Sequence, residues 1–160
     1  MDFEYPWAFE SRRSAVHARN GMVATSHPVA AQAGLAVLQD GGNAADAAIA
    51  TAAVLNVVEP NMTGIGGDAF ALTQFDDEYE ALNASGPAPA SANLDTYRER
   101  TDATDESGDP AMPEDGGLPV TVPGALAGWD ALAERYGTRD LDGLLEPAVE
   151  YARDGVPVSE

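Results

Sequence analysis

The residues best placed to do chemistry in this 160-residue chain are a polar pair, Asn83 and Ser85. The pair ends a segment with strand character, and Pro87 and Pro89 stiffen the chain that leaves it. An amide and a hydroxyl held in this way can bind a ligand through hydrogen bonds. An ordinary exit from a strand, with Asx and Ser turns, accounts for the same residues equally well. The sequence leaves both interpretations open.

A second candidate is the glycine-rich segment Gly64 to Ala69, which fits the G-x-G-x-x-A fingerprint of dinucleotide-binding loops. That fingerprint works only after a strand and before a helix, because the helix N-terminus holds the pyrophosphate. Here a predicted helix comes first and a predicted strand follows, which argues against dinucleotide binding. We expect the glycines to permit positive φ, or tight packing, where helix gives way to strand. As a second possibility the loop borders a pocket, lined by Thr63, Gly64, Gly66, Gly67 and Asp68.

Other catalytic groupings find little support. The only histidines, His17 and His27, lack a recognisable Ser-Asp-His context, and G-x-S-x-G is absent. His27 stands at a predicted helix start, where a structural role is the better explanation. The absence of cysteine excludes thiol catalysis, disulfides and cysteine-based zinc sites. The scattered carboxylates are most simply a solvated surface, so no metal site is predicted.

Two helices are predicted ahead of these candidates. The first runs from Pro28 to Gln39, because its apolar residues recur at helical spacing, with Ser26 or His27 as its N-cap. The double glycine at 41–42 ends it, and residues 21–26 before it could form a short strand.

The second predicted helix begins after Asn43, its N-cap, and runs from Ala44 to Val57. Asp46 is its third residue, where a carboxylate favours the free N–H groups. The helix is apolar all round, so we expect protein to enclose it at the centre of a layered fold.

A β-hairpin follows, with strands at 70–75 and 79–84. Residues 94–100 are predicted to form one or two helical turns, and residues 101–117 an acidic exposed loop. Two more helices end the chain, one through Tyr136 and one over 141–153. Their predicted inward faces are Leu126, Trp129, Leu132 and Ala133, then Leu144, Leu145, Ala148, Val149 and Ala152. Residues 1–160 are assigned to part of a single domain.

The strongly negative net charge limits the classes of molecule that this protein is expected to bind. The formal net charge is −19 and the pI is about 4.1, and all eight basic residues are arginine. Such a surface should repel nucleic acids and anionic membranes, so we expect neither as a partner. Spread acidity without lysine fits a halophilic source, since high salt screens self-repulsion. Residues 1–21 are predicted to form a surface arm. They show no secretory signal, which favours a cytoplasmic protein.

Several blocks, in one order over residues 21–159, resemble the front of a gamma-glutamyltransferase (gamma-glutamyltranspeptidase) precursor. They are HPVAAQAGLAVLQDGGNAADAAIATAAVLNVVEP, TGIGGDAFAL, LNASGPAPA, VTVPGALAGWDAL and LLEPAVEYARDGVPVS. The resemblance implies an α+β fold, the αββα sandwich of N-terminal-nucleophile hydrolases. This chain would supply the helical part and the first β-hairpin of that sandwich.

The resemblance also implies a precursor that cuts itself into a large and a small subunit. The nucleophile would be the new N-terminal threonine of the small subunit, activated by its own α-amine. That threonine would lie beyond residue 160, so we expect no catalytic residue here and no activity from this chain alone. The implied partners are the small subunit and a small-molecule amide or γ-glutamyl substrate, and no metal or organic cofactor is implied.

One departure from the family pattern concerns recognition of the γ-glutamyl group. Typical members carry an Asp-Phe-Arg-Glu type sequence here, whose arginine binds the substrate α-carboxylate, and Ser85 aligns with that arginine. Acylase-like relatives instead carry Asn-x-Ser-Gly-Arg-Ala-Pro, and in this sequence Pro87 stands in place of the arginine of that motif. Because serine lacks the bidentate guanidinium fork, we expect weakened γ-glutamyl recognition and an acylase-like or amidase-like enzyme.

A different class of function remains as the alternative, a truncated non-catalytic paralogue that serves as a binding or structural module. A gene that continues past Glu160 into a glycine-rich region with a Thr-Thr or Thr-Ser cleavage site favours the enzyme. A stop codon at that point favours the paralogue.

Overall fold

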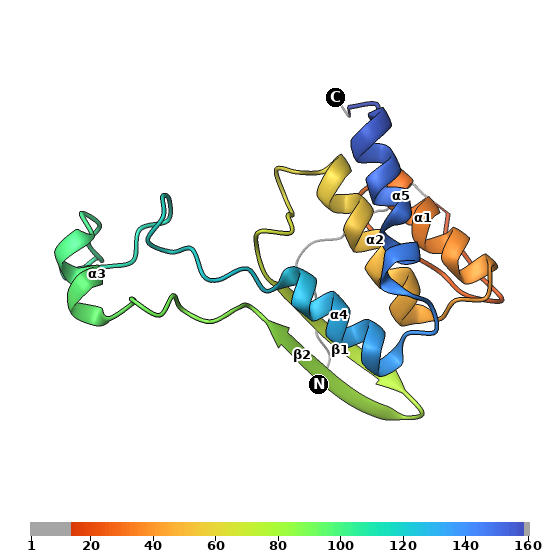
Figure 1. Ribbon diagram of the computed structural model, residues 1–160, viewed down its shortest axis with the longest axis horizontal. Coiled ribbons are helices and arrows are strands. Elements are labelled where there is room, and N and C mark those ends of the chain that lie inside the picture. Colours follow the sequence, from red (N-terminus) through yellow and green to blue (C-terminus); the bar gives the residue numbers. More distant parts are fainter. Residues whose placement is uncertain (1–13, 159–160) are drawn as a thin grey trace.

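The computed structural model describes residues 14–158, which form a helical layer on one face of a two-stranded sheet (Figure 1). Residues 14–21 are exposed and form neither helix nor strand, and the rest of the predicted N-terminal arm lies outside the described residues. In chain order the elements are α1 (Pro28–Gln39), α2 (Ala44–Val58), β1 (Ala69–Phe75), β2 (Glu78–Ala84), α3 (Leu94–Arg100), α4 (Ala125–Tyr136) and α5 (Leu141–Asp154).

Local sequence signals set both ends of α1, as predicted. His27 rather than Ser26 is the N-cap, and its Nδ1 accepts a hydrogen bond from the Val29 N–H at 3.2 Å. After Asp40, Gly41 adopts φ 87°, the left-handed conformation that glycine permits. Residues 21–26 do not form the predicted strand, because no segment of the described chain pairs with them.

The predicted N-cap of α2, Asn43, is confirmed, and the structure shows that it forms a capping box with Asp46. Asn43 Oδ1 accepts from the N–H groups of Ala45 and Asp46 at 2.9 and 3.1 Å. In return, Asp46 Oδ2 accepts from the Asn43 N–H at 2.8 Å. Three backbone N–H groups at the start of the helix are thereby satisfied.

The core forms where α2 packs against α1, α4 and α5 (Figure 1). The backbones of α1 and α2 approach closely at Gly34, where a Cβ would lie 2.1 Å from Thr51 Oγ1. The buried cluster consists of Ala30, Ala33, Ile49, Ala53, Val54, Trp129, Leu144 and Ala148.

The predicted enclosure of α2 on all sides is only partly observed. Ala48 is exposed, and Ala52 and residues 55–58 are half-buried. The described residues contain no element that covers this side of the helix. Likewise, three residues predicted to face inward are exposed, because nothing in residues 14–158 packs on them: Leu126, Val149 and Ala152.

The hairpin is antiparallel, and Ala69 pairs with Ala84 at its open end. Its turn has two residues rather than the predicted three, because Glu78 already pairs with Phe75. Asp76 and Asp77 have φ of 49° and 65°, which suits a type I′ turn. One face of the hairpin packs on α4, while the other exposes Phe70, Leu72 and Tyr79.

Between β2 and α4 the chain makes a long excursion away from the helical layer, with α3 near its tip (Figure 1). The acidic stretch 101–117 lies on this excursion and is mostly exposed. It contains a turn in which Asp105 Oδ1 accepts from the N–H groups of Ser107 and Asp109, at 2.8 and 3.0 Å. No helix within residues 14–158 is both long and apolar enough to span a bilayer.

Candidate functional site

Three segments far apart in sequence converge where β1 begins, β2 ends and α4 begins. The Gly67 carbonyl accepts from the N–H groups of Gly124 and Ala125 at 2.9 and 3.1 Å. The Val122 N–H donates to the Pro87 carbonyl at 3.0 Å. The glycine-rich loop, the strand exit and the start of α4 therefore form one continuous surface.

Asn83 and Ser85 lie on the strand exit, which is one of these three segments. The Ser85 N–H donates to Asn83 Oδ1 at 3.0 Å, and the Ser85 carbonyl accepts from the Thr121 hydroxyl at 2.8 Å. The first bond is the Asx turn expected of an ordinary strand exit. This turn uses only the N–H of Ser85, which leaves the Ser85 hydroxyl available to a ligand. A role of the pair in substrate binding stays a prediction.

A hollow of about 450 Å³ adjoins Ser85, between the end of β2 and the first turn of α4. None of its lining side chains is charged. The lining residues are Leu82, Asn83, Ala84, Ser85, Gly86, Pro87, Pro123, Gly124, Ala127 and Gly128. A substrate carboxylate placed here would meet no guanidinium or ammonium from this lining.

Gly86 makes the crossing of these segments possible. Its φ is +74°, and a Cβ there would lie 1.7 Å from the Val122 carbonyl oxygen. We expect Gly86→Ala to lower the free energy of unfolding of the full-length protein by about 2–3 kcal/mol, because the two segments must separate. Chemical denaturation measures this change.

Gly108 provides the matched control for Gly86. Its φ is +86°, but a Cβ there would meet nothing within 4 Å. Gly108→Ala therefore adds only the backbone strain of a left-handed alanine, about 1 kcal/mol. Equal losses for the two variants would contradict the proposed steric role of Gly86.

The glycine-rich loop borders a second, larger hollow of about 560 Å³, between α2, β1 and α4. All five loop residues predicted to lie near a pocket contribute to its lining: Thr63, Gly64, Gly66, Gly67 and Asp68. Their functional role stays a prediction.

The structure corrects our explanation of the glycines themselves. Neither Gly64 nor Gly66 has a positive φ, and a Cβ on either would meet nothing within 4 Å. Gly67 also lacks a positive φ, and its Cβ would make only an ordinary 3.4 Å contact with the Gly64 carbonyl oxygen. Neither backbone conformation nor packing within the described chain requires glycine at these positions.

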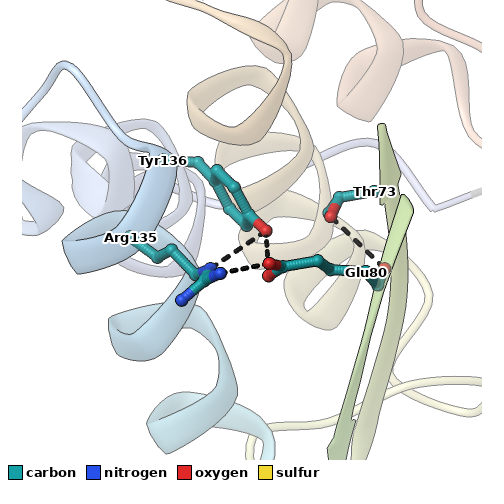
Figure 2. A network of polar contacts seen from close by, with 4 residues as sticks. All are labelled: Thr73, Glu80, Arg135 and Tyr136. Carbon is teal, nitrogen blue, oxygen red and sulfur yellow. Dashed lines mark hydrogen bonds and ion pairs between the residues drawn. The ribbon is translucent and has the colours of Figure 1, made fainter. Parts of the chain in front are cut away.

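A polar network that sequence reasoning missed joins α4 to the hairpin (Figure 2). Arg135 forms an ion pair with Glu80, and the Tyr136 hydroxyl donates to the same carboxylate. Hydrogen bonds from Tyr136 and Arg135 hold the pKa of Glu80 below its ordinary value. The Tyr136 ring also stacks on Phe75 at 4.5 Å between centroids. This network positions the turn end of the hairpin, opposite the end where the three segments meet.

The two histidines lie apart from the converging segments. His27 is buried as the α1 N-cap, so its structural role is observed, whereas His17 is exposed. Throughout residues 14–158 there is no group of three His, Cys, Asp or Glu side chains that could hold a metal ion.

Comparison with known proteins identifies close relatives. The gamma-glutamyltranspeptidase family profile matches residues 30–160. The glutathione hydrolase-like YwrD proenzyme of Bacillus subtilis (strain 168) is 44% identical over 142 residues, which cover 86% of this chain and 25% of that protein. The Acylase ACY 1 proenzyme of Pseudomonas sp. (strain V22) is 36% identical, covering 94% of this chain and 28% of that protein.

Solved structures give the same relationship. The cephalosporin acylase of Bacillus halodurans superposes with a TM-score of 0.84 at 48% identity, covering 98% of this chain and 28% of that chain. The gamma-glutamyltranspeptidase of Helicobacter pylori gives 0.79 at 36% identity, covering 91% and 41%. The chain spans about a quarter of the length of the YwrD proenzyme and of the Acylase ACY 1 proenzyme. It belongs to the gamma-glutamyltranspeptidase family of enzymes, and its helices and hairpin are part of the α+β fold of N-terminal-nucleophile hydrolases.

Proposed function

We propose that the full-length protein hydrolyses or transfers an acyl group from an amide donor, through an N-terminal threonine outside residues 1–160. Membership of a family that contains both glutathione hydrolases and acylases supports this reaction class. Residues 1–160 contribute scaffold and a wall of the substrate site, and a small subunit cut from the same precursor contributes the nucleophile. The proenzyme names of the relatives support such processing.

We further propose an acylase-like or amidase-like donor preference. The observation that carries this proposal is the uncharged hollow beside Ser85. The family resemblance implies that Ser85 stands where typical members carry the arginine. An acyl group without an α-carboxylate loses nothing by the absence of a guanidinium. A γ-glutamyl donor loses a charge-assisted, bidentate contact.

A two-part experiment tests these proposals. Mass spectrometry of the purified full-length protein should find two subunits, the smaller beginning with threonine. The processed protein should then cleave simple acyl anilides more efficiently than γ-glutamyl anilides. Absence of self-cleavage and of amide cleavage would contradict the reaction class. Robust turnover of γ-glutamyl anilides at a low KM would contradict the donor preference alone.

A further inference from the structure

We propose that the side chains of Asn83 and Ser85 form a neutral recognition site for the far end of the acyl chain, and that this site selects an uncharged carbonyl group such as a carboxamide. The inference rests on the proposed function, because it names the acyl group that the same site accepts. It is carried by the orientation of the Asn83 amide, the fixed backbone of Ser85 and the uncharged lining of the hollow beside them.

The first feature is the orientation of the Asn83 side chain. Asn83 is exposed and lies on the face of β2 turned away from α4. The opposite face meets the helix, where Leu82 and Ala84 lie against Gly128. Because only the oxygen of an amide accepts from an N–H, the bond from the Ser85 N–H to Asn83 Oδ1 fixes which end of the amide is Nδ2. Within residues 14–158 this Nδ2 has no hydrogen-bond partner, so its two N–H groups are available to a ligand.

The second feature is the fixed backbone of Ser85. Its N–H donates to Asn83, and its carbonyl accepts from the Thr121 hydroxyl at 2.8 Å. The next residue, Gly86, packs so closely on the Val122 carbonyl that a Cβ would not fit. The Ser85 hydroxyl, which can both donate and accept, has no partner in the described part of the chain. Because the backbone is set before a ligand arrives, binding costs little ordering entropy there.

The third feature is the lining of the hollow, which contains no charged side chain. Two neutral donors do not balance a carboxylate that leaves water, and the net charge of −19 on this chain disfavours an anion further. An uncharged carbonyl oxygen accepts from an amide N–H or a hydroxyl without that penalty. The apolar part of the lining suits a chain of methylene groups, and it consists of Leu82, Ala84, Pro87, Pro123 and Ala127.

A carboxamide uses both side chains of the pair. Its oxygen can accept from Asn83 Nδ2, and its N–H can donate to the Ser85 hydroxyl oxygen. The test uses three anilides whose acyl chains have the length of a glutaryl group and end in a carboxamide, a carboxylate or an isopropyl group. With the wild-type full-length protein, we expect kcat/KM for the carboxamide-ended anilide to exceed that for the carboxylate-ended one by at least about 10-fold.

Asn83→Asp tests the amide with little change of shape. Aspartate keeps an oxygen that accepts from the Ser85 N–H, so the turn is preserved, but a second oxygen replaces the two N–H donors. We expect kcat/KM for the carboxamide-ended anilide, relative to the isopropyl-ended one, to fall about 10-fold. An amine-ended anilide of the same length should gain about 10-fold, because its ammonium pairs with the new carboxylate. Structural damage alone would not produce a loss on one substrate and a gain on another.

Asn93→Asp is the matched control for this variant. Asn93 Oδ1 likewise accepts from a backbone N–H, that of Thr96 at 2.9 Å, and Asn93 does not line the hollow. The control adds the same charge at the same kind of turn, so we expect unchanged ratios between the anilides. Ser85→Ala removes the hydroxyl and leaves the backbone bonds in place. It should lower the ratio of the carboxamide-ended to the isopropyl-ended anilide about 3-fold.

The outcome is separable from that of the proposed reaction. Cleavage of the carboxylate-ended anilide as efficient as that of the carboxamide-ended one would show that a cation from outside residues 1–160 serves the hollow, and would overturn the inference. An equal loss on all anilides in Asn83→Asp, or the same change of ratio in Asn93→Asp, would also overturn it. Each of these results leaves amide cleavage itself standing.

If the full-length protein cleaves no amide, calorimetry measures the same anilides as ligands. Tighter binding of the carboxamide-ended anilide than of the carboxylate-ended one, lost in Asn83→Asp and kept in Asn93→Asp, would support the inference while the proposed reaction fails. Equal Kd values for the two anilides, or no binding of either, would overturn the inference as well.

Discussion

Replacing Asp46 with alanine is expected to lower the free energy of unfolding of the full-length protein by about 3–5 kcal/mol. Asp46 is fully buried. Besides the Asn43 N–H, its carboxylate accepts from the Thr138 hydroxyl at 2.6 Å and from the Thr138 N–H at 2.9 Å. A longer bond from the Arg139 N–H measures 3.3 Å. Alanine would leave these donors unpaired and release the α4–α5 turn from the start of α2. Chemical denaturation measures the loss.

Asp142 supplies the matched control for Asp46. It is also an aspartate in the first turn of a helix, α5, but it is exposed. Asp142→Ala removes only a favourable interaction with the helix dipole, about 0.3–1 kcal/mol. A loss for Asp46→Ala that is no larger than this would show that its buried hydrogen bonds contribute little.

A second prediction for Asp46 concerns how the stability of the protein depends on pH. Burial alone would raise its pKa, but the hydrogen bonds from the Thr138 hydroxyl and from the N–H groups of Asn43, Thr138 and Arg139 together lower it from the ordinary 3.8. Because the folded pKa lies below the unfolded one, the contribution is fully present above pH 3.8 and is lost as pH falls through the folded pKa. Asp46→Asn should therefore flatten the acid side of the stability profile. An unchanged acid limb would contradict the lowered pKa.

Much of the local structure could be predicted because its causes lie within a few residues. The N-cap Asn43 and the double glycine after α1 are short-range signals, and the structure confirms them. The alternation of 70–75 and 79–84 predicts the hairpin in the same way. By contrast, Thr138 bonds to Asp46 across 92 residues, and no local pattern indicates such a partner.

The same distinction between short-range signals and long-range contacts applies to the candidate site. The sequence singled out the glycine-rich loop and the exit of β2, but their meeting with the start of α4 depends on long-range hydrogen bonds. It also offered a reason for the glycines that the structure does not support at Gly64 and Gly66.

The second large effect is expected from Ser85→Arg in the full-length protein. The backbone of Ser85 is held by its bonds to Asn83 and Thr121, which the substitution leaves intact. Its side chain lies beside an uncharged hollow that can accommodate a guanidinium. Arginine would restore the bidentate partner for an α-carboxylate, and hydrogen bonds to charged groups contribute about 1.5–3 kcal/mol. We therefore expect kcat/KM for a γ-glutamyl anilide to rise about 10- to 100-fold.

Two comparisons separate recognition of the carboxylate from a general effect on the enzyme. An acyl anilide without an α-carboxylate should be cleaved by Ser85→Arg at nearly the wild-type kcat/KM, because the new guanidinium has no partner on it. Ser85→Lys should recover less γ-glutamyl activity than Ser85→Arg, since an ammonium supplies the charge without the planar fork. A parallel rise for both anilides, or an equal gain from lysine, would show that the uncharged surroundings of Ser85 do not set the donor preference.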